Sequence, residues 1–331
     1  MQILIFTTVF YPLRGGIENL TLNLCKEFIG KGHEVKVIAY QKQTDALPDI
    51  EVHYAPGFAK MLELFLWCKI YYMPNISLKG IWPLLIDPRK RWVVSQNDFS
   101  LTNKKNLLSL IKLFMIRFAS ENISVSKSIA TSLGTPSEII YNCYDNEVFK
   151  IDPQVEKTLD FVFVGRLVSQ KGCDTLVRAC YDLKLPFKLT IIGDGPELER
   201  LKIMAQQLEL SEHITFTGTL KSTEITAVLN RHKVMIIPSN GKEGFGIVAL
   251  EGLACGCRII ASDSGGLAEA VGDFGQLFQP GDVHQLNGLL KEALQNINQP
   301  NYSPEELAAY LDNYKTQVVA QKYLSVFGSA A

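Results

Sequence analysis

The amino-acid sequence predicts an α/β fold made of two domains. Short apolar runs rich in β-branched residues alternate with amphipathic stretches of helical length, a pattern typical of repeated strand-helix-strand units and a parallel sheet. The chain has 331 residues, and at roughly 100–200 residues per domain this length favours two domains. Hydrophobic residues make up 47% and charged residues 20%, which excludes a disordered chain.

The first half contains five runs that we expect to form strands. They are short, apolar and separated by stretches long enough for helices, so this half predicts its own doubly wound sheet. The runs are Gln2–Thr8, Glu34–Tyr40, Lys69–Met73, Trp92–Ser95 and Asn122–Val125.

The second half contains five further runs, which predict a second sheet. They are Leu159–Val164, Phe187–Ile192, Ile214–Thr217, Val234–Ile237 and Arg258–Ala261.

The polar segment Asn142–Lys157 is the expected linker between the two sheets. The stretch Pro304–Val326 has the apolar spacing of a helix and is expected to fold back onto the first domain. The predicted division is therefore 1–150, 151–310 and a C-terminal helix at 311–331.

The charge and the cysteines of the sequence exclude several classes of protein. The formal net charge of −1 argues against a protein that coats nucleic acid. The longest run without a charged residue, Met1–Leu13, is shorter than the roughly 20 apolar residues of a membrane-spanning helix, and it lacks the basic leader of a secretory signal. Seven scattered cysteines predict buried thiols in a reducing cytoplasm, with Cys255 and Cys257 structural rather than zinc ligands.

Two glycine-containing loops follow predicted strands. Gly15 and Gly16 follow the first strand and open a helix, an arrangement that suits either a phosphate site or a purely structural turn. In the second half, Arg166 stands at a strand exit and Lys171 lies five residues later. Two cations at the carboxyl end of a strand suit a diphosphate, although they also suit a solvated surface.

The segment from Glu243 to Glu251 carries the strongest signal. Its loop holds Gly244, Phe245 and Gly246 and leads into an apolar helix, whose N-terminus favours an anion. The two carboxylates would bracket that anion and bind hydroxyl groups of two sugars. A carboxylate on so apolar a helix needs a partner, and a hydroxylated ligand supplies one.

Taken together, these motifs resemble those of retaining glycosyltransferases of family 4. The resemblance rests on the Glu243/Glu251 pair with seven residues between, on Val164–Gly172 with Arg166 and Lys171, on the turn Ile192–Pro196, on Phe216–Leu220, and on the Gly-Gly-Ile-Glu loop. It covers nearly the whole chain in the expected order. It implies two Rossmann-like domains facing each other across a cleft, the GT-B fold, with a C-terminal helix that returns to the first domain.

The resemblance also implies roles for individual residues. Arg166 and Lys171 would neutralise the diphosphate of a nucleotide-sugar donor, and Glu243 would contact the transferred sugar. Glu251 would hold the ribose hydroxyls. The remaining donor-binding positions would be Gly15, Gly16, Leu220, Gly244, Phe245, Gly246, Ile247 and Val248.

No cofactor and no metal are expected. The sequence has no Asp-X-Asp triplet, so the two cations would supply the positive charge for the leaving group. Family members often carry a histidine after the strand that here reads Trp92–Ser95, whereas this chain has Asn97. An amide cannot act as a base near pH 7 but can orient a hydroxyl group. Asn97, or its neighbour Asp98, is therefore expected to position substrate.

The segment Asp87–Lys127 holds eight basic and three acidic residues. Within it, Asn106–Phe118 has an apolar face flanked by cations, which suits an anionic membrane surface. The alternative, an ordinary helix whose apolar face packs on the core, is the slightly favoured interpretation.

The leading hypothesis is a cytoplasmic, retaining hexosyltransferase, with UDP-glucose as the first candidate donor, that acts in exopolysaccharide biosynthesis. Its acceptor would be a saccharide or lipid-linked saccharide, with peripheral contact at the inner membrane face. Two rivals stay open: a sugar-nucleotide epimerase of the same fold, and a catalytically silent subunit that binds nucleotide sugars.

Overall fold

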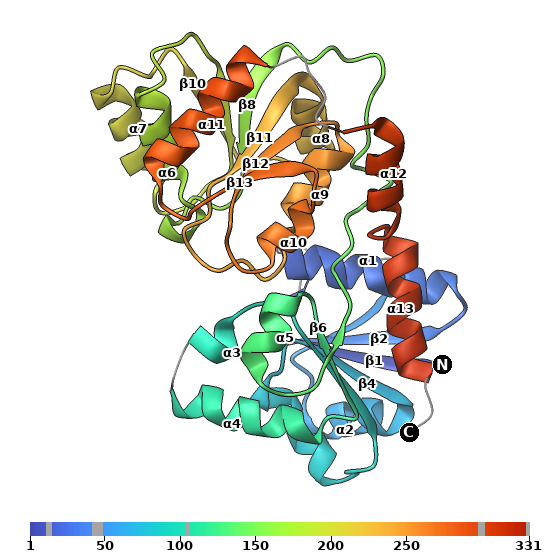
Figure 1. Ribbon diagram of the computed structural model, residues 1–331. Coiled ribbons are helices and arrows are strands. Elements are labelled where there is room, and N and C mark those ends of the chain that lie inside the picture. The colour runs from blue at the N-terminus through green and yellow to red at the C-terminus, as the bar shows by residue number, and fades with distance from the viewer. Residues whose placement is uncertain (11–14, 42–48, 104–105, 297–301, 329–331) are drawn as a thin grey trace. The chain divides into compact units, whose positions relative to one another are not determined.

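The computed structural model describes residues 1–10, 15–41, 49–103, 106–296 and 302–328 (Figure 1). The chain forms two compact units. The first unit contains Met1–Cys143 and Tyr314–Ala331, and the second unit contains Tyr144–Asn313. Each unit has one sheet of parallel strands flanked by helices, so the predicted α/β class is confirmed.

The first unit is built on a seven-stranded sheet with the order β3-β2-β1-β4-β5-β6-β7. Because the central strands are covered on both faces, they are almost wholly apolar; Ile3 to Phe6 are fully buried. The strands are β1 (Gln2–Thr7), β2 (Glu34–Ala39), β3 (Glu51–Tyr54), β4 (Ile70–Pro74), β5 (Arg91–Gln96), β6 (Glu121–Ser124) and β7 (Glu138–Ile139).

Helices cover both faces of this sheet. On one face α1 (Gly16–Gly30) packs beside α13 (Thr316–Gly328), with the rings of Phe28 and Phe327 5.6 Å apart (Figure 1). On the other face Phe65 of α2 (Phe58–Trp67) contacts Tyr71 at 5.2 Å. The remaining helices are α3 (Ser100–Asn103), α4 (Leu107–Met115), α5 (Lys127–Leu133) and the 3-10 turns η1 (Leu78–Gly80), η2 (Trp82–Leu85) and η3 (Ile116–Phe118). The predicted return of the C-terminal helix to the first domain is confirmed.

The second unit has a six-stranded parallel sheet with the order β10-β9-β8-β11-β12-β13. Its strands are β8 (Leu159–Val164), β9 (Leu189–Ile192), β10 (Ile214–Gly218), β11 (His232–Ile237), β12 (Arg258–Ser262) and β13 (Gly275–Phe278). Its helices are η4 (Ser169–Lys171), α6 (Cys173–Tyr181), α7 (Leu198–Gln207), α8 (Ser222–Arg231), α9 (Ile247–Ala254), α10 (Leu267–Val271), α11 (Val283–Gln295) and α12 (Pro304–Asp312).

In each sheet the strand order reverses its direction at one place, which we call the switch point. In the second unit the chain runs outward from β8 through β9 to β10, then returns to pair β11 with the other side of β8. In the first unit β1 and β4 are the corresponding neighbours. Open parallel sheets bind ligands beyond the carboxyl ends of such strands, so these edges are the places to look for a site.

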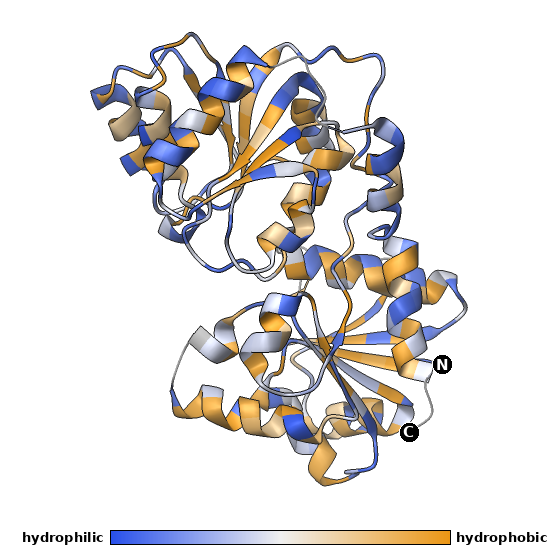
Figure 2. Ribbon diagram, viewed as in Figure 1, coloured by the Kyte–Doolittle hydropathy of each residue, from blue (hydrophilic) through white to orange (hydrophobic). Residues whose placement is uncertain are grey.

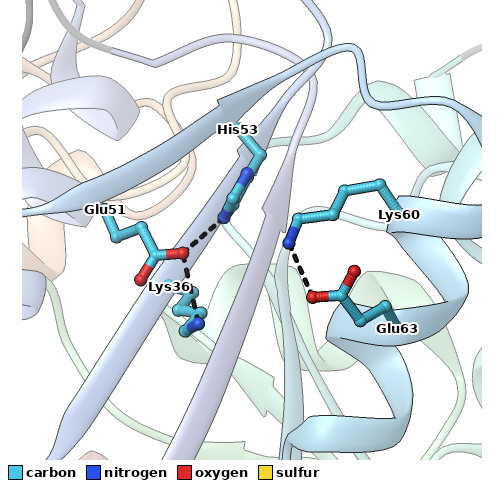
Figure 3. A network of polar contacts seen from close by, with 5 residues as sticks. All are labelled: Lys36, Glu51, His53, Lys60 and Glu63. Carbon is cyan, nitrogen blue, oxygen red and sulfur yellow. Dashed lines mark hydrogen bonds and ion pairs between the residues drawn. The ribbon is translucent and has the colours of Figure 1, made fainter.

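Three strands were absent from the sequence prediction: β3, β7 and β13. The strand β3 carries charged residues instead of an apolar run, because it lies at the edge of its sheet. Glu51 of β3 contacts His53 at 2.7 Å and Lys36 of β2 at 3.1 Å, and Lys60 pairs with Glu63 on α2 at 2.6 Å (Figure 3). The Lys36–Glu51 pair, which the apolar pattern does not contain, connects the edge strand to its neighbour β2.

The unit boundaries differ from the predicted ones. The first boundary lies after Cys143 instead of residue 150, and the second lies after Asn313 instead of residue 310. The segment expected as a linker is bound to the second unit: Asn230 donates to the Lys150 carbonyl at 3.0 Å and accepts from the Asp152 amide at 2.8 Å. The Lys157 ammonium likewise donates to the Cys255 carbonyl at 2.8 Å.

All seven cysteines are buried free thiols, as predicted. Within the described ranges, no helix has the length and apolar character needed to cross a bilayer.

Candidate active site

Two loops of the second unit are joined at the carboxyl edge of its sheet. One follows β8 and the other follows β11, and the amides of Asn240 and Gly241 both donate to the Gln170 carbonyl, at 2.9 and 3.0 Å. Gly172 has a φ of +65°, and a Cβ there would collide with the Pro238 carbonyl. Because only glycine permits this backbone and this approach, the two loops are locked together.

This junction brings Lys171 and Glu243 into contact. The Lys171 Nζ lies 2.7 Å from Glu243 Oε1, and the Ser239 hydroxyl donates to the same oxygen at 2.5 Å. Both charged side chains keep part of their surface open to solvent. The sequence predicted both charged residues but neither their pairing nor Ser239, which is fully buried two residues after the end of β11. A serine directly after an apolar strand is too common to single out.

Arg166 stands beside this junction in the chain but has a different environment. Its backbone is fixed from both sides, because the Gly165 amide donates to the Ile192 carbonyl at 3.0 Å and the Leu167 amide to the Asp194 carbonyl at 2.9 Å. Its guanidinium is exposed and makes no ion pair with the part of the chain that the structure describes. A guanidinium on a fixed backbone, without an ion-pair partner among the described residues, is available to an anionic ligand.

The N-terminus of α9 lies at the same edge. Gly246 caps it with a φ of +94°, and no side chain caps the helix. A Cβ at Gly246 would collide with Leu267, while Phe245 anchors the loop by burying its ring. Gly244 precedes this anchor, and Ile247 and Val248 form the half-buried first turn. Uncapped first-turn amides together with the helix dipole favour an anion here.

Glu251 lies on α9, one turn after its start. It is half-buried, and burial raises the pKa of Glu251 to about 7, with a further contribution from the negative charge of Asp145. Among the described residues no donor satisfies this carboxylate. A carboxylate that is partly removed from water and has no donor is stabilised by a ligand that brings hydroxyl groups.

Leu220 follows β10 and is half-buried just before α8. The structure thus places Arg166, Lys171, Leu220, Glu243 and the first turn of α9 beyond the carboxyl ends of strands in one sheet.

The glycines predicted in the first unit lie at the start of α1. Gly15 is the N-cap residue and Gly16 opens the helix, without a side-chain cap. A Cβ at Gly15 would collide with the Glu18 carboxylate, so that carboxylate already approaches the uncapped helix end. The preceding part of the predicted loop, residues 11–14, lies outside the described residues.

Asn97 follows β5 in the first unit and is 6% exposed. Its amide nitrogen donates to Ser95 Oγ at 3.1 Å, and its backbone amide donates to Asn75 Oδ1 at 2.8 Å. Asn97 Oδ1 is buried without a hydrogen-bond partner among the described residues. Asp98 accepts from Asn75 at 3.1 Å and from the Ser100 amide at 2.8 Å. Asp98 therefore fixes the local backbone, and Asn97 retains an unused acceptor.

Within the described ranges, no three side chains of His, Cys, Asp or Glu converge in a way that would hold a metal ion.

The sequence and the structure both have known counterparts. The family model described as "Glycosyl transferases group 1" matches residues 145–317, more than half of the chain. The chain is 26% identical to the uncharacterized glycosyltransferase MJ1178 of Methanocaldococcus jannaschii, over 92% of this chain and 87% of that protein. It is 39% identical to the GDP-mannose-dependent alpha-(1-6)-phosphatidylinositol monomannoside mannosyltransferase of Mycolicibacterium smegmatis, over 34% of this chain and 32% of that protein.

Among solved structures, Anabaena Alr3699/HepE in complex with UDP matches with a TM-score of 0.86 at 19% identity, covering 100% of both chains. The same Anabaena protein has also been solved with UDP-glucose. This similarity shows the fold, two Rossmann-like domains of the GT-B type.

Proposed function

The chain belongs to the glycosyl transferases of group 1 and is a glycosyltransferase, and from this premise we propose that it moves a hexose from a UDP-sugar to a saccharide or lipid-linked acceptor with retention at the anomeric carbon. The observation that carries the proposal is the cluster of Arg166, Lys171, Glu243 and the α9 N-terminus at one sheet edge. Two cations and a row of uncapped amides suit a diphosphate.

The chemistry follows from these groups. The bond between the anomeric carbon and the diphosphate oxygen breaks, and negative charge grows on that oxygen, where Arg166 and Lys171 stabilise it. The acceptor oxygen attacks from the same face and forms the new bond to the anomeric carbon. The acceptor proton passes to the departing phosphate oxygen, so retention needs no protein nucleophile. Glu243 holds the sugar, and Glu251 accepts hydrogen bonds from the ribose.

UDP-glucose is the first candidate donor, and it is supported by the structural match to the Anabaena protein solved with UDP-glucose. The mycobacterial relative named for GDP-mannose makes that donor the natural competitor. Incubating the protein with UDP-, GDP- and ADP-sugars and measuring the released nucleotide separates them. We expect slow, acceptor-independent release of UDP from UDP-glucose; faster release of GDP from GDP-mannose would overturn the donor assignment.

The same assay tests the two rival functions. An epimerase would convert the sugar without releasing nucleotide, and a silent binding subunit would hold UDP tightly and release nothing. We also propose that turnover needs no metal, because the cations of the second unit can neutralise the leaving group. Turnover should persist in EDTA, and its loss there with recovery on adding Mg²⁺ would contradict this part.

The acceptor proposed here belongs to polysaccharide biosynthesis. A lipid-linked acceptor lies at a bilayer, so peripheral contact between the first unit and an anionic membrane is part of the proposal.

A further inference from the structure

Helix α4 of the first unit is oriented opposite to an ordinary surface helix. Its large apolar side chains are exposed, with Leu107 at 73%, whereas Ser109 is only 7% exposed. The exposed residues continue into η3, where Phe118 is 65% exposed and its ring contacts that of Phe114 at 5.2 Å. In Figure 2 α4 is a nearly continuous hydrophobic ribbon at the margin of its unit. The interpretation slightly favoured from the sequence, a helix whose apolar face packs on the core, is therefore wrong.

The spacing of these residues makes a single stripe, which we call the α4 stripe. Positions separated by three, four, seven and eleven residues lie on one side of a helix. The stripe consists of Leu107, Leu110, Ile111, Phe114 and Phe118, all of which are exposed. Contiguous exposed apolar surface of this kind marks an interaction site.

The charges around the α4 stripe indicate which kind of partner binds it. The segment 99–120 contains four cations and no acidic residue. Of these, Arg117 is exposed and Lys112 half-buried, while Lys104 and Lys105 lie outside the described residues. A second copy docked stripe to stripe would bring the same cations together, which is unfavourable. Anionic lipid headgroups complement the cations, and acyl chains complement the leucines and phenylalanines.

The length of α4 determines how it meets a bilayer. Nine residues make a helix about 13 Å long, far short of the hydrocarbon thickness. A short helix with an apolar stripe and flanking cations lies in the plane of the interface.

We propose that the α4 stripe is a membrane-docking surface that inserts into the headgroup and acyl boundary of an anionic bilayer. This deepens the proposed function and rests on it only for the lipid-linked nature of the acceptor; docking itself needs neither donor nor acceptor.

Vesicle flotation tests the proposal. The full chain should float with vesicles of phosphatidylcholine and phosphatidylglycerol in equal parts and stay behind with phosphatidylcholine alone. The double substitution Leu110→Ser/Phe114→Ser should lower partitioning by at least about 100-fold, because two apolar side chains no longer leave water. Arg117→Gln should lower it about fivefold, and added salt should weaken binding in the same direction.

A matched control substitutes two equally exposed apolar residues of the second unit, Tyr181→Ser/Ile203→Ser. This control variant should float like the unsubstituted protein. Both double variants should have the melting temperature of the unsubstituted protein. Three results would overturn the proposal: no flotation of the unsubstituted protein with anionic vesicles, equal flotation of the Leu110/Phe114 variant, or a dimer in light scattering that this variant abolishes.

Acceptor-independent UDP release keeps this test separate from the proposed function. Release of UDP without flotation supports the proposed transfer reaction and contradicts the docking surface. Flotation without release of any nucleotide supports the docking surface and contradicts the proposed transfer from a UDP-sugar.

Discussion

The two units share one architecture, yet the carboxyl edges of their sheets carry different chemistry. In the second unit the edge is charged and open: Arg166 is exposed, and Lys171 pairs with Glu243 at 2.7 Å. In the first unit the edge beyond β4 and β5 is made of buried amides, with Asn97 bonded to Ser95 and Asn75. Its nearby carboxylate, Asp98, is occupied by two donors.

A shared fold therefore does not determine the chemistry at its switch points. A charged, partly solvated edge can exchange its own ion pair for a diphosphate, since Lys171 keeps a counter-ion in either state. A buried amide edge cannot hold such charge at acceptable cost, but it can orient a hydroxyl group. We therefore propose that the donor binds at the second unit and that the first unit orients a hydroxyl group.

Removing a cation from the charged edge should have the largest effect. Lys171→Ala should lower kcat by about 100- to 1000-fold, because a donor aimed at the leaving diphosphate is lost. Steady-state kinetics on the preferred UDP-sugar measures it. The neighbouring exposed Lys242 supplies the control, and Lys242→Ala should change kcat less than about threefold. Similar activity of the two variants would show that Lys171 is only a partner of Glu243.

Neutralising the carboxylate of the pair should have the next largest effect. Glu243→Gln keeps the shape of the side chain but removes its charge, so we expect kcat to fall about 30- to 100-fold through a weaker hold on the sugar. UDP affinity, measured by calorimetry, should stay within about threefold or improve, because Lys171 loses a competitor for the diphosphate. A parallel loss of UDP affinity would mean that Glu243 acts on the nucleotide instead.

At the amide edge of the first unit the expected effect is smaller and selective. Asn97→Ala should lower transfer to the acceptor about tenfold, because one hydrogen bond to a hydroxyl group is lost, while acceptor-independent UDP release stays unchanged. The ratio of these two rates is the measurement. Ser100→Ala, which leaves the Ser100 amide bonded to Asp98, is the control. If both rates and the melting temperature of Asn97→Ala fall together, the role of Asn97 is structural.

The comparison also shows where sequence reasoning succeeds. Parallel-strand cores are apolar runs, so β1, β8 and β11 were located within two residues of their bounds. The residues of the charged edge were found because glycines and charges stand out after such runs. Their pairing was not predicted, because the contact between Lys171 and Glu243 depends on β8 and β11 being neighbours in the sheet. The residues of the two loops do not indicate the strand order.

The sequence also does not determine whether the apolar face of a helix points to the core or to solvent. The apolar spacing of α4 is the same whether its stripe faces the core or solvent. The exposure of the stripe residues and the burial of Ser109 decide between the two orientations. The strand β3 was missed for a related reason, since an edge strand held by Lys36 and Glu51 lacks an apolar run. In both cases the deciding term is tertiary contact, which local pattern does not contain.

The smallest expected effect concerns Glu251, a half-buried carboxylate of α9 that has no donor among the described residues. Burial raises the pKa of Glu251 to about 7, so the charged carboxylate that we propose accepts from the ribose is lost below neutrality. UDP affinity should therefore fall about five- to tenfold from pH 8 to pH 6. Glu251→Gln should flatten this dependence, whereas Glu243→Gln should preserve it.

Apo stability should change with the opposite sign. A carboxyl whose pKa is raised in the folded state stabilises the protein while protonated, and this stability is lost as the pH rises through about 7. The melting temperature of the unliganded protein relative to that of Glu251→Gln should therefore increase from pH 8 to pH 6, while UDP affinity decreases. If both quantities move in the same direction, Glu251 does not meet the nucleotide, because only a ligand that needs the charged carboxylate separates the two trends.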